Sequence, residues 1–411
     1  MKKRIKTFLK IYPWYYSISC WLLFFDIINT IYLTTVKGLS AAEFSLLLAI
    51  SLTVSILLHI PFLHIIKKWG NTFSLRFGNF LFIISAIMLT FCNSFWGLTI
   101  GKTLYEVSFI FKEMLIVELR RNLIYIHKED DFIQYSNDAT MKYTIIALVT
   151  GLLAGPLFNI HSYIPMYLAI VSTLICFYLS FYLFDVSEER ALTDFSNISK
   201  KVFSHKKKIT ILFIFILIAY GLGMGIIDIG QNQAKLFVQY ELEDGLGLKI
   251  TALVFGSVVA LSNIPAIFSN MIFPKIYQKI HNNSGYLLSD LLIISFLLLL
   301  FGYFVPLPFG IRITIMFLGF LLILMLRGPC KNYYQDLALK HCQGEEEQDM
   351  AIYLSLSRDA FGAAISGVAA FILLDYPLEY VMIMLIIVSV IQLFLFYKVH
   401  QLIIVSEKTA N

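Results

Sequence analysis

Long apolar stretches alternate with short polar segments along all 411 residues of this chain. Each apolar stretch reaches the roughly 20 residues that a helix needs to cross a hydrocarbon layer about 30 Å thick. The pattern therefore predicts an all-α polytopic membrane protein with twelve spanning helices in two sets of six. The first set is 13–35, 42–65, 74–94, 95–119, 139–160 and 162–185, and the second is 209–234, 247–273, 286–305, 311–333, 351–374 and 377–400.

A hydrophilic connector separates the two sets. It runs from Asp185 to Lys208 and holds Glu188, Glu189, Arg190, Lys200, Lys201 and Lys206 to Lys208. We therefore expect an N-terminal six-helix bundle over residues 1–185, a cytoplasmic connector over 186–208, and a C-terminal six-helix bundle over 209–411.

Composition supports a membrane protein. The chain is 58% hydrophobic and 14% charged, with a mean hydropathy of +0.77, so too few polar side chains exist to cover a globule in water. The net charge of +5 does not indicate nucleic-acid binding, because the positive residues lie in short loops. The five cysteines are scattered and indicate neither a disulfide framework nor a metal site. No cleavable signal peptide is evident, because the first span continues to full membrane length.

The distribution of positive charge predicts the orientation. One side of the predicted membrane carries Lys2, Lys3, Arg4, Lys6, Lys10, Lys67, Lys68, Arg76, Arg120, Arg121, Lys128, the connector lysines, Lys275, Lys279 and Lys340. The opposite loops carry only Lys37, Lys235, Lys249 and Arg312. Because cytoplasmic loops are enriched in Lys and Arg, we expect both termini and the connector in the cytoplasm of a plasma-membrane protein.

The two halves of the chain resemble each other at corresponding places. Gly38-Leu39-Ser40 opens span two, as Gly245-Leu246-Gly247 opens span eight. Phe25-Asp26-Ile27-Ile28-Asn29 in span one resembles Ile227-Asp228-Ile229-Gly230-Gln231 in span seven, and Asn137-Asp138-Ala139 resembles Arg358-Asp359-Ala360. Three such matches favour an internal duplication, which places the substrate site of many transporters at the midplane between two pseudo-symmetric halves.

The chain resembles the major facilitator superfamily over nearly its whole length. The stretch from Gly38 through Pro61 to Lys67-Lys68-Trp69-Gly70 is similar to the second helix and following loop of that family. The loop usually reads Gly-x-x-x-Asp-Arg-x-Gly-Arg-Arg. Here Gly70 matches, whereas Leu63, Lys67 and Lys68 replace the first glycine, the aspartate and the arginine. The departure puts in doubt the charge lock that the loop usually makes between bundles.

Two further stretches carry the resemblance. Gly101-Lys102-Thr103-Leu104 in span four resembles the Gly-Arg-x-Leu motif, whose basic residue is associated with proton coupling in the family. Gly151-x-x-x-Gly155-Pro156 in span five resembles the motif of the drug–proton antiporters, although Asn159 lies where a glycine pair would follow. The resemblance implies a proton-coupled transporter similar to multidrug efflux members of Gram-positive bacteria.

Asp26 near the middle of span one is the first candidate for chemistry. An ionised side chain at the bilayer centre costs roughly 2.5–3.5 kcal/mol, so it should face a partner or a polar cavity. Ser19, Asn29 and Thr30 share its face at helical spacing, which favours a cavity-lining stripe that binds substrate or protons. The alternative is a structural aspartate that hydrogen-bonds between packed helices.

Span four carries the densest charge within the predicted membrane. Lys102, Glu106 and Glu113 lie at offsets of four and seven, so one helix face presents all three. Lys102 and Glu106 can pair within the helix, either as a coupling site or as a purely structural ion pair. Lys112 points elsewhere, and we expect its long side chain to extend toward the cytoplasmic surface.

The second half of the chain offers a matching set of candidates. One face of span seven presents the polar side chains Asp228, Gln231, Asn232 and Lys235. Three glycines earlier in the same span, Gly221, Gly223 and Gly225, permit close helix contact. In span ten, Arg327 and Lys331 share a face. We expect Arg327 to form a gating ion pair with Glu113 or Asp359, with binding of an anionic substrate as the alternative.

No nucleotide-binding or hydrolase motif occurs in the sequence, so the chain is not expected to be an enzyme and its energy source should be an ion gradient. The predicted function is proton-coupled export of small amphipathic or hydrophobic compounds by a monomer without cofactor or metal. Import or facilitated diffusion of a sugar, peptide or organic anion remains an alternative. A non-transporting sensor or a membrane enzyme is less favoured, since neither an output domain nor a catalytic cluster is present. The sequence does not identify the substrate.

Overall fold

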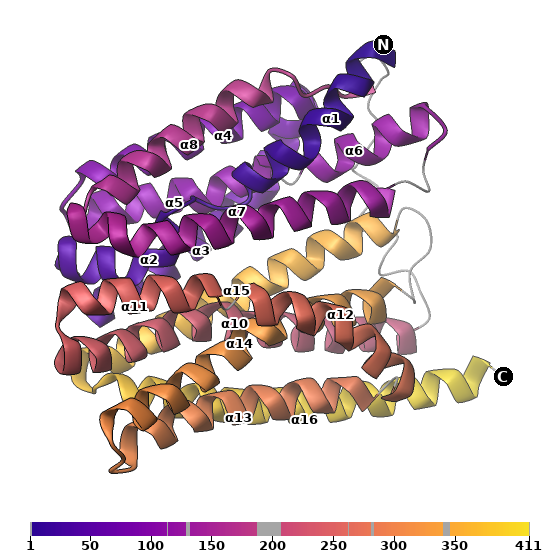
Figure 1. The fold of residues 1–411 in the computed structure, drawn as a ribbon. Helices are drawn as coiled ribbons and strands as arrows, with labels where there is room; N and C mark the ends of the chain where they lie inside the picture. The colour runs from indigo at the N-terminus through magenta and orange to yellow at the C-terminus, as the bar shows by residue number, and fades with distance from the viewer. Residues whose placement is uncertain are drawn as a thin grey trace. The chain divides into compact units, whose positions relative to one another are not determined.

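The computed structural model in Figure 1 describes residues 2–112, 114–128, 132–186, 207–261, 263–280, 283–339 and 346–410. All regular secondary structure in these ranges is helical. Most of the predicted connector, residues 187–206, lies outside the described residues.

The helices follow the predicted spans in order. The first half forms α1 (Lys2–Ser19), α2 (Phe25–Ile31), the π-helix η1 (Tyr32–Val36), α3 (Ala41–Trp69), α4 (Asn71–Phe91), α5 (Phe95–Lys112), α6 (Met114–Tyr125), α7 (Phe132–Ile160) and α8 (Ile164–Ser180). The second half forms α10 (Lys207–Leu246), α11 (Leu248–Leu261), α12 (Asn263–Ile280), α13 (Ser284–Phe304), α14 (Phe309–Leu339), α15 (Glu346–Asp375) and α16 (Leu378–Ala410).

Eight helices in the described ranges are long and apolar enough to cross a membrane by length and composition, and α8 is a shorter apolar helix. The other three predicted spans are each described in more than one helical range. Span one is α1 with α2 and η1. Span four is covered by α5 and α6, and span eight by α11 and α12, while residues 113 and 262 between these ranges lie outside the described residues. Together these account for all twelve predicted spans.

Span one differs from the continuous helix that we predicted. The helix stops after Ser19 and resumes at Phe25, and Phe24 in the interruption has a φ of +67°. Residues 20–24 read Cys-Trp-Leu-Leu-Phe and contain neither glycine nor proline, so local sequence gives no warning of the break. Its cause lies in side chains from another helix, described below.

Span seven is longer than predicted, because α10 continues from the expected end at 234 to Leu246. Leu236, Phe237 and Val238 beyond Lys235 are buried, so apolar packing carries the helix past its first polar cluster. The helix ends at Gly247, whose φ of +74° suits the left-handed residue that follows many helix ends.

The contacts divide the chain into two compact units. Unit 1 contains Met1–Leu39, Ile50–Thr193 and Leu248–Asn263, and unit 2 contains Ser40–Ala49, Asp194–Gly247 and Ile264–Asn411. Each unit is therefore built mainly from one half of the chain and takes one segment from the other half. The segment that joins unit 1 from the second half contains α11.

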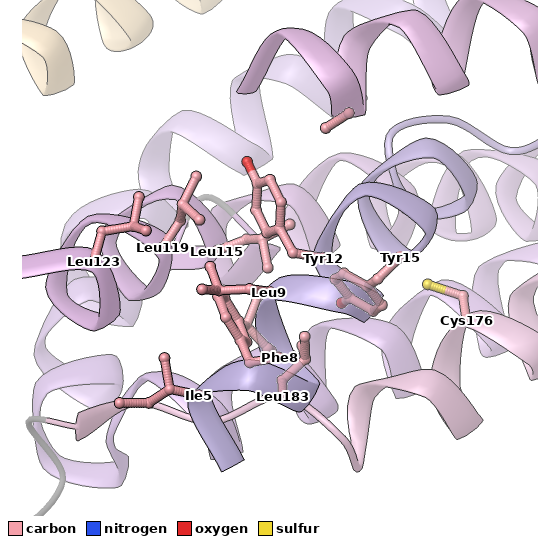
Figure 2. Close-up of a cluster of buried hydrophobic side chains, with 12 residues drawn as sticks. Ile5, Phe8, Leu9, Tyr12, Tyr15, Leu115, Leu119, Leu123, Cys176 and Leu183 are labelled. Carbon is pink, nitrogen blue, oxygen red and sulfur yellow. The ribbon is translucent and has the colours of Figure 1, made fainter. Parts of the chain in front are cut away.

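A buried apolar cluster in unit 1 fixes α1 (Figure 2). Ile5, Phe8 and Tyr12 of α1 pack with Leu119 and Leu123 of α6, and all five are almost fully buried. At burial free energies of about 1.5–3 kcal/mol per large apolar side chain, this cluster holds the first half of span one firmly in place.

Helix α10 is the central helix of unit 2. In its most apolar segment 67% of the residues are buried, compared with 28–50% in the other seven candidate spans. Its glycines permit the close contact predicted from the sequence. A Cβ on Gly225 would lie 2.9 Å from the backbone nitrogen of Gly362 in α15.

We predict that Gly221→Ala lowers the free energy of unfolding by about 1–3 kcal/mol, the usual range for overpacking. The added Cβ would lie 2.7 Å from the carbonyl oxygen of Ser357 and would also clash with Phe361. Denaturant unfolding of the purified protein in detergent measures the change. Gly310→Ala is the matched control, because a Cβ there meets nothing within 4 Å. Equal losses of stability in the two variants would contradict the predicted close contact.

Candidate functional site

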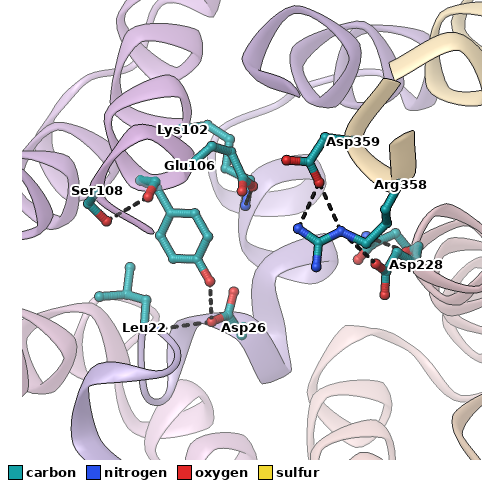
Figure 3. Close-up of polar contacts among 10 residues, drawn as sticks. Leu22, Asp26, Lys102, Glu106, Ser108, Asp228, Arg358 and Asp359 are labelled. Atoms are coloured by element: carbon teal, nitrogen blue, oxygen red, sulfur yellow. Dashed lines mark hydrogen bonds and ion pairs between the residues drawn. The ribbon is translucent and has the colours of Figure 1, made fainter. Parts of the chain in front are cut away.

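Two groups of polar and charged side chains within the spanning helices contain most of the predicted site residues, one group in each unit (Figure 3). The Asp26 group consists of Asp26, Lys102, Tyr105 and Glu106 in unit 1. The Asp228 group consists of Asp228, Arg327, Arg358 and Asp359 in unit 2. Each group is described below within its own unit.

The break in span one places Asp26. The side chain lies near the start of α2, and its Oδ2 atom accepts a hydrogen bond from the backbone N–H of Leu22 at 2.8 Å. The Tyr105 hydroxyl of α5 donates to the same oxygen at 3.0 Å. Hydrogen bonds to an ionised acceptor are the strong ones, so both donors hold the carboxylate in one orientation.

The break also changes which residues accompany Asp26. Ser19, which we expected on the same helical face, ends α1 on the other side of the interruption, so helical spacing does not relate the two residues. Asn29 and Thr30 follow Asp26 in α2 and are buried, and the Asn29 side chain accepts a hydrogen bond from the Thr30 backbone N–H at 2.9 Å.

Lys102 and Glu106 form the predicted ion pair within α5, with 2.8 Å between Lys102 Nζ and Glu106 Oε1. Lys102 Nζ also lies 3.8 Å from the centre of the Tyr105 ring, which is cation–π contact. Tyr105 therefore touches the ion pair with its ring and Asp26 with its hydroxyl. It joins the two sites that the sequence analysis had treated separately.

Lys112, the last residue of α5, does not extend to the surface as we expected. The residue is only 7% exposed. Its Nζ donates to the Ser19 carbonyl oxygen at 3.2 Å and lies 3.1 Å from the centre of the Phe82 ring. The end of α1 and an aromatic ring compensate this buried charge, so it has no need to reach solvent.

The Asp228 group is a chain of alternating charges on three helices. Asp228 of α10 lies 3.1 Å from Arg327 Nε of α14 and 4.0 Å from Arg358 Nε of α15. Arg358 in turn pairs with the adjacent Asp359 at 2.7 Å. The group holds two acids and two arginines, so its formal charges balance.

The gating ion pair of Arg327 with Glu113 or Asp359 stays a prediction. Arg327 and Asp359 belong to one network, in which Asp228 pairs with Arg327 and Arg358 pairs with Asp359. The other proposed partner, Glu113, lies outside the described residues. Gln231 is half-buried on α10, three residues beyond Asp228.

The motif glycines pack helices together. A Cβ on Gly101 would lie 3.1 Å from the Met88 side chain of α4. Gly151 and Gly155 of α7 face Gly256 of α11, where an added Cβ would lie 3.1 Å from the Gly155 nitrogen. Pro156 is exposed within α7, one residue beyond this contact. The glycines therefore allow two pairs of helices in unit 1, α4 with α5 and α7 with α11, to approach closely.

The loop before α4 keeps the one glycine that its backbone requires. Gly70 has a φ of +83°, which side chains other than glycine rarely adopt. The following residues bond within unit 1: Asn71 donates to Asp185 at 2.6 Å, and Thr72 donates to Glu118 at 3.0 Å. Hydrogen bonds of this kind tie the loop to its own unit.

Sequence reasoning missed Tyr105 and Arg358 as site residues. A signal existed for each, since Tyr105 lies between Lys102 and Glu106 and Arg358 precedes Asp359 in a repeated tripeptide. Sequence alone did not show that both side chains reach across to an aspartate on another helix. Within the described ranges, no group of three or more His, Cys, Asp or Glu residues could hold a metal ion.

The sequence matches no protein-family profile and no curated protein. The fold is similar to solved structures over nearly the whole chain. The nucleoside transporter NupG has a TM-score of 0.73 at 13% identity, covering 96% of this chain and 98% of that one. A bacterial homologue of the iron transporter ferroportin has a TM-score of 0.72 at 12% identity, covering 97% and 99%. The peptide transporter POT in complex with sulfate has a TM-score of 0.69 at 13% identity, covering 97% and 95%.

These similarities establish the fold class. The chain is an all-α, multi-pass membrane protein with the twelve-helix, two-bundle fold of the major facilitator superfamily. At such low sequence identity the similarity establishes the fold but does not identify the substrate.

We predict that Asp228 and Arg327 are energetically coupled. A double-mutant cycle of Asp228→Asn and Arg327→Gln should give an interaction free energy of about 1 kcal/mol, within the range for paired residues in contact. Unfolding in mixed detergent micelles measures each corner of the cycle. The control cycle replaces Arg327→Gln with Arg312→Gln, because Arg312 pairs with Glu241 instead and should show no coupling. Equal coupling in the two cycles would contradict the pairing.

Proposed function

We propose that this protein is a secondary active transporter that couples proton movement to the export of small amphipathic or hydrophobic compounds. The observation that carries the proposal is the position of Asp26, which lies inside span one at a break in the helix and receives a hydrogen bond from Tyr105.

Asp26 is better suited to proton exchange than Asp228. The Leu22 N–H and the Tyr105 hydroxyl that donate to its carboxylate are both neutral, so protonation of Asp26 leaves neither of these two donors with an uncompensated charge. Asp228 lies between two arginines, and its protonation would leave buried guanidinium groups without their counter-charge. The proton therefore belongs to Asp26, and the Asp228 network serves as an ion-pair lock.

Proton binding can drive a conformational change only if it alters the relative free energies of two states. Protonation removes the charge of Asp26 and so weakens both of these hydrogen bonds, the one from Leu22 in span one and the one from Tyr105 in α5. The neighbouring Lys102–Glu106 pair, which contacts the same tyrosine, provides a second place where partners can change. These residues form the proposed coupling site, with Asn29 beside Asp26.

The comparisons support transport of a small solute, because the similar structures are transporters of nucleosides, iron and peptides. The resemblance of Gly151, Gly155 and Pro156 to the antiporter motif supports export. Their close packing against Gly256 gives that motif a physical role in this chain.

Import or facilitated diffusion of an organic anion or peptide is the second candidate. The observation that favours it is the presence of two arginines, Arg327 and Arg358, within the spanning helices. A guanidinium group can bind a carboxylate or phosphate with two parallel hydrogen bonds. In this case the substrate anion would replace Asp228 as the partner of an arginine.

We predict that Asp26→Asn and Glu106→Gln each reduce proton-driven transport by about 5–150-fold, the usual size of a coupling between two sites. The assay measures ethidium accumulation in everted vesicles under an imposed pH gradient. Asp375→Asn is the matched control, because Asp375 is exposed at the end of α15 and should leave transport unchanged. If both variants transport at the native rate, the coupling assignment is wrong.

We predict further that labelled nucleosides, dipeptides, sugars and organic anions give no counterflow in proteoliposomes, whereas amphipathic dyes do. The two candidate functions differ in polarity of substrate, so this assay separates them directly. Counterflow of an anion that is lost in Arg327→Gln would favour the second candidate. Counterflow of dyes alone would favour export of amphipathic compounds.

A further inference from the structure

The break in span one needs a cause. Residues 20–24 are all compatible with a helix, and Phe24 is held at a φ of +67°, a conformation that costs a non-glycine residue roughly 1–3 kcal/mol. Unpaired backbone groups are costly in the interior of a membrane. Contacts from outside span one must therefore favour the interruption over a continuous helix.

Both ends of the break are held by one helix, α5. Lys112 Nζ donates to the carbonyl oxygen of Ser19, where α1 stops. Tyr105 donates to Asp26, just beyond the point where α2 begins. Lys112 follows Tyr105 by seven residues, and Asp26 follows Ser19 by seven. The earlier residue of α5, Tyr105, bonds the later residue of span one, and the later residue, Lys112, bonds the earlier one, as expected between antiparallel helices. The two hydrogen bonds are therefore seven residues apart on both segments.

Lys112 is placed to stop the helix. In a continuous helix the Ser19 carbonyl oxygen would accept from the backbone N–H four residues later, that of Leu23. The Lys112 ammonium takes that position, and the end of a helix favours a positive charge. Burial and the Phe82 ring fix the ammonium, so it cannot move away easily.

We infer that Lys112 is a positioning residue: by capping Ser19 it keeps span one broken, and the break in turn aims the Asp26 carboxylate at Leu22 and Tyr105. This inference rests on the proposed function only for its consequence in transport. The structural step, that Lys112 maintains the break, stands on contacts within unit 1 alone.

The test measures backbone amide hydrogen exchange at residues 21–24 in the full-length protein in lipid nanodiscs, resolved by mass spectrometry with fragmentation. In Lys112→Met these amides should exchange about tenfold more slowly than in the native protein, because α1 extends through them; tenfold corresponds to about 1.4 kcal/mol. Lys112→Arg keeps a charged donor and should retain the native exchange. Lys142→Met, which removes a lysine from the Asp138 pair on α7, should also leave exchange at 21–24 unchanged.

A compensating substitution separates positioning from general stability. Phe24→Gly relieves the strained φ and weakens a continuous helix by about 1 kcal/mol. In the double variant Lys112→Met with Phe24→Gly, native exchange and proton-driven ethidium transport should both return. A purely structural role for Lys112 would not predict this rescue.

The inference is overturned by native exchange in a folded Lys112→Met protein, or by native amides at 21–24 that already exchange as slowly as those of α2. If Lys112→Met does not fold, Lys112→Gln takes its place. Failure of both neutral variants to fold would assign Lys112 to bundle stability and would also overturn the inference. If exchange responds as expected but Asp26→Asn transports normally, the positioning role holds and the proposed proton coupling fails.

Discussion

Every backbone N–H and C=O group inside a membrane must find a partner within the protein, and the rest of this structure depends on that constraint. It makes every described element a helix, and it sets the length of most of them. It also gives meaning to an interruption, because a helix broken inside the bilayer must be repaired by side chains. In this chain Lys112 and Asp26 make those repairs at Ser19 and Leu22. Asp26 of span one and Lys112 of span four thus satisfy backbone groups at the break.

The same constraint applies to the charges themselves. A buried lysine or aspartate is tolerated where a partner compensates its lost hydration. Lys102 has Glu106 and the Tyr105 ring, and Lys112 has a helix end and the Phe82 ring. Such compensation makes each group sensitive to the position of its neighbours. A change of protonation or of helix position alters several contacts together, which is the behaviour that an alternating transporter requires.

The sequence predicts the helices well because hydrophobic length is a property of each segment alone. All twelve predicted spans have counterparts, and the Lys102–Glu106 pair follows from helical spacing within α5. Contacts between helices were harder to predict. The partner of Asp26 depends on the rotation of α5, and the break in span one depends on Lys112, which lies far away in sequence. Gly221, Gly223 and Gly225 predicted close helix contact, but not that Gly225 would meet Gly362 of α15.

The two polar groups occupy corresponding places in the two halves of the chain. Asp26 lies in the first span of its half and receives Tyr105 from the fourth; Asp228 lies in the first span of the second half and receives Arg327 from its fourth. The sequences around Asp26 and Asp228 resemble each other, and each aspartate also contacts a side chain from the fourth span of its own half. Both observations favour duplication of a six-helix ancestor.

The duplicated arrangement has diverged at the donor. The tyrosine hydroxyl that donates to Asp26 is neutral, whereas Asp228 pairs with the charged guanidinium of an arginine. In the function that we propose, the first half exchanges protons at Asp26 and the second half holds an ion-pair network around Asp228.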